Sequence, residues 1–334
     1  MRNFKIFNLK KITVLLMALL IMVSCGKKEN VVDTGSVVVY SSIDEKLLTQ
    51  LKFGFEKKYP NITMSYYHNS SDKVFNKISD EYTYGNVEAD VMFMGNVLDF
   101  IKLNKNNFLD NYVSSEAKNI NKIFKDDDNT YAAGALRTVG IVYNSDVYGK
   151  NAPKSFSDLL DEKYKNKLIM TNPSTANIMK FFVAYMIENE KYGIDYFEKL
   201  SEQGLKLVSG TKDTVNEVLN NDDKIAITID YAAFPKIENN ENIEFSYLTD
   251  CLTEYIPIGL LKESKNKNNA KKFIDFILSS DGQNIICDYG YIPSKNGVSK
   301  EHNVKQIADK NTKIDYDVLY ANYNNFVSEF MKIF

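Results

Sequence analysis

Short apolar runs alternate along the chain with stretches in which apolar residues recur every three or four positions. Continuous apolar runs are typical of strands buried on both faces of a sheet, and the wider spacing is typical of amphipathic helices. The pattern predicts strands at residues 36–40, 62–67, 89–94, 140–143, 168–171, 205–208, 225–229 and 256–261. It predicts helices at about 44–59, 71–82, 98–101, 176–190, 214–219, 270–278 and 317–334. This strand–helix alternation predicts an α/β fold, with mainly parallel sheet flanked by helices on both faces.

The first 25 residues have the pattern of a secretion signal that ends at a cysteine. Basic residues up to Lys11 precede a largely apolar run at 12–23, which is too short to span a membrane. Ser24 precedes Cys25 as in a lipoprotein cleavage box, although Met22 stands where such boxes usually have Leu. We therefore expect residues 1–24 to be a signal peptide and Cys25 to be lipidated. Residues 25–35 would tether an extracytoplasmic body to the membrane.

Removal of the signal leaves 310 residues, enough for two domains, with 37 Lys and Arg against 44 Asp and Glu. This acidic balance, without a basic block, argues against nucleic acid as a partner. The two histidines, His68 and His302, are too few for a His-built zinc site and argue against a Ser-His-Asp hydrolase. Cys251 and Cys287 remain in the body, and the sequence leaves open whether they pair.

Small polar residues follow several of the predicted strands, at the edge where α/β sheets bind ligands. These residues are Ser41, Ser42 and Asp44 after the first strand, Asn96 after the third, Ser174, Thr175 and Asn177 after 168–171, and Thr211 after 205–208. Hydroxyls and free backbone N–H groups at a helix N-terminus can bind an anion. The same residue types cap ordinary helices, so each turn has a structural alternative.

Two further candidates lie at strand ends. Arg137 is the only arginine after the signal, and its planar guanidinium suits a carboxylate or a phosphate; a structural salt bridge is the alternative. Asp230 and Tyr231 directly follow the strand at 225–229. There Tyr231 could donate a hydrogen bond or stack on a ligand, or it could be a half-buried packing residue.

Several segments together resemble the solute-binding proteins of ABC importers. They include VVVYSS, FEKKYPNI, ADVMFMGN, RTVGIVYNSDV, TNPSTAN and IAITIDY, and then IPIGLLKESKNKNNAKKFIDFILSSDGQNII followed by GYIP. More narrowly, the chain is similar to the extracellular family that contains ferric-iron, phosphonate, sugar-phosphate and thiamine binders. The resemblance covers nearly the whole chain after the signal.

This resemblance implies a type II periplasmic-binding-protein fold, a two-lobed clamshell that closes on a ligand by a hinge motion. Lobe 1 would comprise residues 36–136 plus 258–300, and lobe 2 residues 137–257 plus 301–334. The protein would be a non-catalytic monomer that delivers its ligand to a membrane permease.

The resemblance also implies a ligand class. Ser174, Thr175, Asn177, Thr211 and Arg137 match positions that hold an oxyanion in the family, so a small organic phosphate or phosphonate is the leading expectation. Ser41 and Ser42 would bind from the opposing lobe, beside Asn96. Asp44 or Asp230 would receive an amine or hydroxyls.

Ferric iron is the alternative ligand, and Fe³⁺ would then be cargo, since no cofactor or resident metal is expected. Its ligands would include Asp44 and Tyr231. The acidic position after the third strand is Gly95 here, and the expected Tyr-Tyr pair is Tyr231-Ala232, so the iron set is incomplete.

Two other functions stay open from the sequence. One is a secreted hydrolase, although no Walker A, GxGxxG, HExxH or GxSxG motif is present. The other is a sensory role, in which the binder presents its ligand to a membrane receptor.

Overall fold

The computed structural model describes residues 34–239, 241–298, 307–308 and 314–334. The described residues from 35 onward form one compact unit. The predicted signal peptide, Cys25 and almost all of the predicted tether lie outside the described residues, so lipidation stays a prediction.

The described residues contain a mixed sheet and ten α-helices. The strands are β1 (Gly35–Ser41), β2 (Ile62–His68), β3 (Val91–Phe93), β4 (Leu109–Asp110), β5 (Ala132–Asn144), β6 (Leu168–Thr171), β7 (Lys206–Val208), β8 (Ile225–Ile229), β9 (Ile243–Ser246), β10 (Leu252–Leu261) and β11 (Ile292–Pro293). The helices are α2 (Glu45–Lys58), α3 (Ser71–Tyr84), α4 (Val97–Lys105), α5 (Asn177–Glu188), α6 (Gly193–Glu202), α7 (Thr211–Asn220), α8 (Asp230–Glu238), α9 (Lys267–Leu278), α10 (Ser280–Asp288) and α12 (Tyr316–Phe330). Five short 3₁₀ helices include η1 (Ser115–Asn119).

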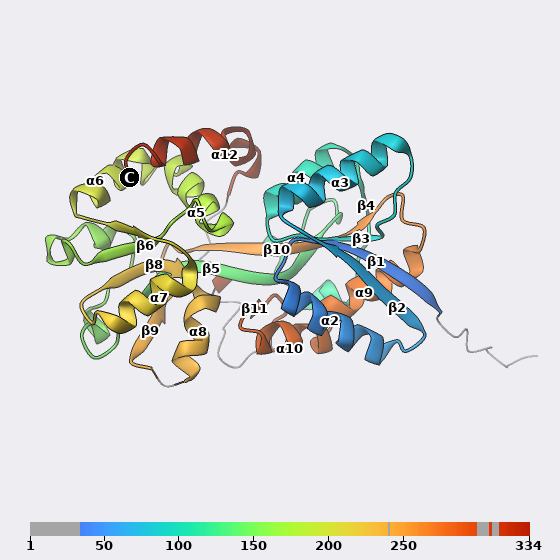
Figure 1. Cartoon of the computed structure of the whole chain (residues 1–334), viewed down its shortest axis with the longest axis horizontal. Helices are drawn as coiled ribbons and strands as arrows, with labels where there is room; N and C mark the ends of the chain where they lie inside the picture. Colours follow the sequence, from blue (N-terminus) through green and yellow to red (C-terminus); the bar gives the residue numbers. More distant parts are fainter. Residues whose placement is uncertain (1–33, 240, 299–306, 309–313) are drawn as a thin grey trace, which may run out of the picture. The chain divides into compact units, whose positions relative to one another are not determined.

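The sheet joins two groups of strands through two long strands. Its order is β2-β1-β3-β10-β5-β8-β6-β7. We call β2, β1 and β3 group A, and β8, β6 and β7 group B; strands are parallel within each group. The long strands β5 and β10 are antiparallel to each other and to the strands next to them. Figure 1 shows these two strands side by side between the groups. The predicted α/β class is confirmed, and its antiparallel part comes from β5 and β10.

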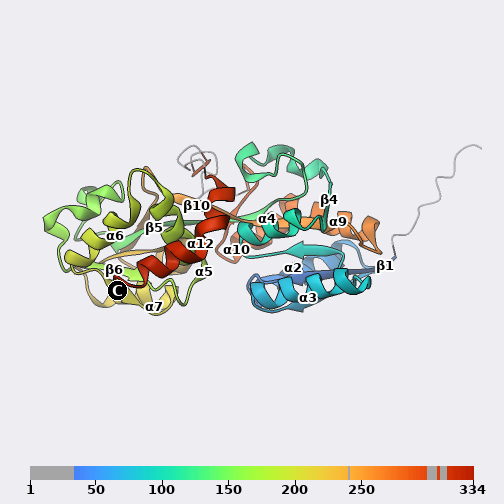
Figure 2. The ribbon, with the colours of Figure 1, turned by 90° about the horizontal axis from the view of Figure 1, so that it is seen from above.

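Helices cover both faces of the sheet. In Figure 1, α3, α4, α5, α6 and α12 lie on one face, and α2, α7, α8, α9 and α10 lie on the other. The C-terminal helix α12 packs along α5 and also contacts α4, as Figure 2 shows. The division into two lobes at the predicted boundaries stays a prediction.

The first helix shows how local sequence sets an element. Asp44 caps α2 by accepting from the backbone N–H of Lys46, and Leu47, Leu48 and Phe55 are among the residues that form its buried stripe. Pro60 follows the helix and cannot continue it.

The sequence pattern misses most of the length of β5, which was predicted only at 140–143. The strand is buried on both faces, and its first half contains small residues rather than a branched apolar run. Two glycines, one in each half of β5, show how closely the strand is packed. A Cβ on Gly134 would lie 2.7 Å from the Phe93 ring, and one on Gly140 would lie 2.5 Å from the carbonyl oxygen of Ser246. Glycine is therefore required by close packing at both positions.

Candidate functional site

The carboxyl ends of the two strand groups face each other across the middle of β5 and β10. Phe93 at the end of β3 pairs with Ile258, and Ile229 at the end of β8 pairs with Val139, which lies opposite Leu252. Ile258 and Leu252 therefore mark the two carboxyl ends on β10. They are six residues apart, or about 20 Å at the usual strand rise. Ligands of α/β sheets bind outside the carboxyl ends of strands. The topology therefore brings the predicted site residues of both groups to the two ends of this stretch.

In group B, the N-termini of α5 and α7 are held together by one side chain. The Thr175 hydroxyl donates to the carbonyl of Asn172 (3.0 Å) and accepts from the backbone N–H of Gly210 (3.3 Å). The Asn172 side chain accepts from the N–H of Ser174 (2.8 Å), which fixes the turn. We call residues 172–177 and 209–212 the paired helix N-termini.

The paired helix N-termini leave donors available for an anion. Their N-cap residues, Ala176 and Gly210, have no side chain that could cap the helices, whereas Asp44 and Asn96 cap α2 and α4. The side chains of Ser174 and Asn177 are exposed, and Thr211 begins α7. Two helix dipoles and uncapped N–H groups favour a phosphate-sized oxyanion at this place.

The candidates in group A are largely occupied by contacts within the protein. The buried Ser41 hydroxyl donates to the carbonyl of Phe93 (2.6 Å), and Asn96 Oδ1 accepts from the N–H of Leu98 (2.7 Å). Ser42 Oγ accepts from the N–H of Gly95 (3.0 Å) and from the Ser71 hydroxyl (3.0 Å). Ser41 and Asn96 therefore shape the edge of group A, and Ser42 lies at its surface.

Asp44 combines its capping role with a contact to a distant tyrosine. The Tyr289 hydroxyl donates to Asp44 Oδ1 (2.6 Å), which also accepts from the N–H of Lys46 (2.8 Å). Partial burial acts to raise the pKa of Asp44, but the hydrogen bonds from Tyr289 and the backbone outweigh it and lower the pKa. Asp44 is therefore a carboxylate at neutral pH.

Arg137 on β5 forms an ion pair with Glu254 on β10, and we call this part of the two long strands the floor of the site. Its side chain is 11% exposed, and its Nε and Nη2 donate to Oε2 of Glu254 at 2.9 and 2.6 Å. Nη2 also donates to the carbonyl of Gly95, which links β5 to the turn after β3. Glu254 is fully buried, and burial raises the pKa of its carboxyl while Arg137 opposes that rise. The salt bridge that the sequence left as an alternative is present.

Asp230 and Tyr231 directly follow β8, as predicted, and begin α8. The fully buried Asp230 carboxylate accepts from the N–H of Thr138 and of Tyr231, both at 2.8 Å. Burial raises the pKa of Asp230 to about 7, against the effect of those hydrogen bonds. The Tyr231 ring stacks on Tyr291 at 4.8 Å between centroids. Asp230 thus ties α8 to β5, and Tyr231 is half-exposed.

Several residues of the site were not found from the sequence. They are Ser71 on α3, Asp99 on α4, Glu254 on β10, and Tyr289 and Tyr291 in the turn between α10 and β11. Tyr289 and Tyr291 flank the glycine before Ile292-Pro293, so their i, i+2 spacing was the only available signal. Glu254 lies in the part of β10 that the pattern missed.

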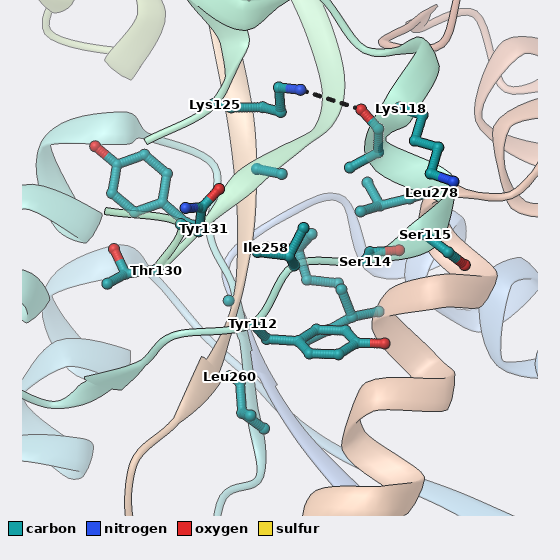
Figure 3. Close-up of a pocket in the computed structure, with 16 residues that line it drawn as sticks. Tyr112, Ser114, Ser115, Lys118, Lys125, Thr130, Tyr131, Ile258, Leu260 and Leu278 are labelled. Atoms are coloured by element: carbon teal, nitrogen blue, oxygen red, sulfur yellow. Dashed lines mark hydrogen bonds between the residues drawn. The ribbon is translucent and has the colours of Figure 1, made fainter. Parts of the chain in front are cut away.

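A cavity of about 360 Å³ lies elsewhere, between η1, β5, β10 and α9 (Figure 3). Tyr112, Tyr131 and Leu278 line it, and Lys125 donates to the carbonyl of Ala117 beside it. None of the residues predicted from the sequence lines this cavity, so it is separate from the candidate site.

In the part of the chain that the structure describes, no helix is long and apolar enough to cross a membrane. Nor do those residues contain a group of three or more His, Cys, Asp or Glu side chains that could hold a metal ion.

The chain is similar to known proteins in sequence. A family profile described as "Bacterial extracellular solute-binding protein" matches residues 89–322. A putative 2-aminoethylphosphonate-binding periplasmic protein of Salmonella typhimurium is 27% identical over 287 residues, which cover 80% of this chain and 82% of that protein.

Two solved structures show the same fold at low identity. A ferric binding protein from Campylobacter jejuni has a TM-score of 0.72 and 21% identity, covering 89% of this chain and 99% of that one. The periplasmic binding protein AfuA from Actinobacillus pleuropneumoniae, with fructose-6-phosphate bound, has a TM-score of 0.67 and 22% identity, covering 90% and 98%. The type II periplasmic-binding-protein fold is thereby confirmed.

Proposed function

The chain belongs to the family of bacterial extracellular solute-binding proteins, whose members supply ABC importers, and we propose that its solute is a small organic phosphonate or phosphate. The observation that carries this proposal is the pair of uncapped helix N-termini at α5 and α7, joined by Thr175. Such a site offers backbone donors and two positive dipole ends to a compact dianion. The Salmonella relative, named for 2-aminoethylphosphonate, and AfuA, solved with fructose-6-phosphate, support the same class.

The roles of the remaining residues follow from their placement. Ser174, Asn177 and Thr211 would contact the oxyanion directly, and Thr175 would position the two helices. Ser42 would approach from group A when the lobes close. Arg137 is bound to Glu254 and Gly95, so its charge would act on the anion from the floor of the site. The lipid anchor on Cys25 and transfer to a permease complete the proposal of an extracytoplasmic import protein.

Ferric iron is the second candidate because of one feature. The phenols of Tyr231, Tyr291 and Tyr289 lie in a row that ends at the Asp44 carboxylate. Phenolates and carboxylates are hard oxygen ligands suited to Fe³⁺. Burial raises the pKa of Tyr289 and of Tyr291, which opposes formation of the phenolates that iron needs. We therefore place iron behind the phosphonate class.

A calorimetric titration of the purified protein separates these candidates. The panel is 2-aminoethylphosphonate, ethylphosphonate, fructose-6-phosphate, inorganic phosphate, and Fe³⁺ with carbonate. We expect saturable binding of at least one phosphonate or phosphate ester, and no turnover product. Binding of Fe³⁺ alone, with a visible tyrosinate–iron absorption band, would replace the proposal with the iron function.

A further inference from the structure

The cavity between η1, β5, β10 and α9 is large for a protein interior and lies apart from the candidate site. Its volume is about 360 Å³, whereas folded proteins are packed nearly as closely as crystals of small molecules. Pockets that bind small molecules have volumes from about 300 Å³ upward. Val113 lines the cavity and is 70% exposed, so a ligand can enter from solvent. The cavity therefore has the size and the access of a second binding site.

The buried part of the cavity wall is largely apolar. It includes the side chains of Ile258, Leu260, Ile274 and Leu278, from β10 and α9. A buried water needs two to four polar partners, which these aliphatic side chains do not offer. An apolar cavity of about 150 Å³ holds benzene, so this one has room for an apolar body of roughly ten carbon atoms.

A lysine supplies positive charge at one side of the cavity. The backbone of Lys125 pairs with Ala132 at the start of β5, which fixes the lysine beside the cavity. Lys125 is half-buried, and its ammonium donates to the carbonyl of Ala117 (3.2 Å). Within the described part of the chain it forms no ion pair. Because an ammonium has three donors, two remain available for an anion.

Negative charge lies beside another part of the wall, and the protein already satisfies it. Tyr112 and Ser114 line the cavity, and their hydroxyls donate to the Asp275 carboxylate at 2.8 and 2.5 Å. The ammonium of Lys271 lies 5.3 Å from the centre of the Tyr112 ring. This side would therefore repel an anionic group and does not need a cation from a ligand.

Charge and apolar surface are thus arranged along one direction. In Figure 3, Lys125 and Tyr112 lie on opposite sides of Ile258, which belongs to the apolar wall. We propose that the cavity binds an amphipathic carboxylate, an aliphatic acid of medium chain length, with its carboxylate at Lys125 and its chain along the apolar wall. The charge-assisted hydrogen bond would set the orientation, and burial of the chain would supply the affinity. This second site is independent of the proposed phosphonate or phosphate solute.

Calorimetric titration with octanoate, octanol and octylammonium tests the charge, because the three share one chain length. We expect saturable binding of octanoate, roughly ten-fold weaker binding of octanol, and the weakest binding for octylammonium. Lys125→Gln should lower the affinity for octanoate roughly ten-fold and leave that for octanol unchanged. Lys122→Gln is the matched control, since Lys122 is 87% exposed and does not line the cavity. It should bind octanoate as the wild type does.

A second variant tests the place of binding. Ala132 lines the cavity, so Ala132→Leu would put a larger apolar side chain into it. We expect the affinities for octanoate and octanol both to fall at least roughly ten-fold, with Tm unchanged or raised, because the added carbons fill existing space. If Ala132→Leu instead lowers Tm, Lys125→Gln gives the decisive result.

The outcomes are separate from those that test the proposed function. Absence of saturable octanoate binding, equal affinity for octanoate and octanol, or tighter binding of octylammonium would overturn the second site. So would unchanged octanoate affinity in Lys125→Gln, or in a stably folded Ala132→Leu. Titration of Lys125→Gln with 2-aminoethylphosphonate should match the wild type, because the cavity shares no residue with the paired helix N-termini.

Discussion

The Arg137–Glu254 pair allows a quantitative test of how the floor of the site is built. Both groups are withdrawn from water, with side-chain exposures of 11% and 0%. Replacing Arg137 with Gln would leave the Glu254 carboxylate buried without its cation. Charges about 4 Å apart at an effective dielectric constant of about 20 interact by about 4 kcal/mol. That value agrees with the loss of about 3–5 kcal/mol seen when one partner of a buried pair is removed.

The assay is calorimetric unfolding of four proteins: wild type, Arg137→Gln, Glu254→Gln and the double variant. In a protein of this size about 1 kcal/mol corresponds to roughly 2 °C in Tm, so Arg137→Gln should lower Tm by roughly 6–10 °C. The double variant should recover at least about 2 kcal/mol of that loss, because it leaves no unpaired buried charge.

The matched control is Lys58→Gln, which breaks an ion pair of similar length with Asp281 (2.7 Å) on the surface. Asp281 is 64% exposed, so this change should cost less than about 1 kcal/mol. If Arg137→Gln were no more destabilising than Lys58→Gln, the pair would not be a structural element. Arg137 would then be free to serve the ligand.

Three further outcomes follow from single residues. Asp230 stays protonated up to about pH 7 in the fold but ionises near pH 3.8 when unfolded, so the free energy of unfolding should fall by up to about 4 kcal/mol as pH rises between those values. Asp230→Asn should flatten the profile of Tm against pH. An unchanged profile would contradict the raised pKa of Asp230. Asp90 is fully buried and accepts hydrogen bonds from Val38, Ser264 and Asn266. Asp90→Ala should therefore lower the free energy of unfolding in denaturant by at least about 3 kcal/mol, and an unchanged value would refute the stabilising role of these hydrogen bonds. Thr175→Val should weaken phosphonate binding roughly five-fold, because it removes the hydroxyl that accepts from the Gly210 N–H. The control is Thr83→Val on α3, which removes a hydroxyl that donates to the carbonyl of Ser79 and should leave phosphonate affinity unchanged.

Elements with strong periodicity could be predicted from the sequence. The strands at 168–171 and 225–229 have the predicted bounds, and α2, α3 and α5 lie within a few residues of theirs. Their apolar positions face one core, so local pattern and tertiary packing agree. The long strands β5 and β10 were only partly found, because residues such as Gly134 and Glu254 are set by close packing and by a cross-strand ion pair.

The candidate site was likewise predicted only in part. The turn at 172–177 was found because small polar residues after a strand are a local signal. Helix α8 was missed because Pro235 lies inside it, and proline usually ends a helix. Whether a polar residue faces a ligand or the protein depends on partners far along the chain. Asp44 meets Tyr289 and Arg137 meets Glu254 across separations of more than 100 residues, which no local pattern encodes.

The most direct test of the central claim adds one negative charge to the paired helix N-termini. Asn177 is exposed at the first position of α5, and Asn177→Asp would set a carboxylate beside the proposed oxyanion. Because Asn177 would contact the oxyanion, the charges would lie about 4 Å apart; even at the dielectric constant of water, about 80, a dianion is then repelled by about 2 kcal/mol, or roughly thirty-fold in affinity. The same charge favours the helix N-terminus, so stability should not fall.

The control is Asn268→Asp, which makes the same change in the first turn of α9, outside the candidate site. Titration with 2-aminoethylphosphonate should show a large loss of affinity in Asn177→Asp, with Tm unchanged or raised, and wild-type affinity in Asn268→Asp. Equal affinity in all three proteins would contradict the account, because the anion would then bind somewhere other than the paired helix N-termini.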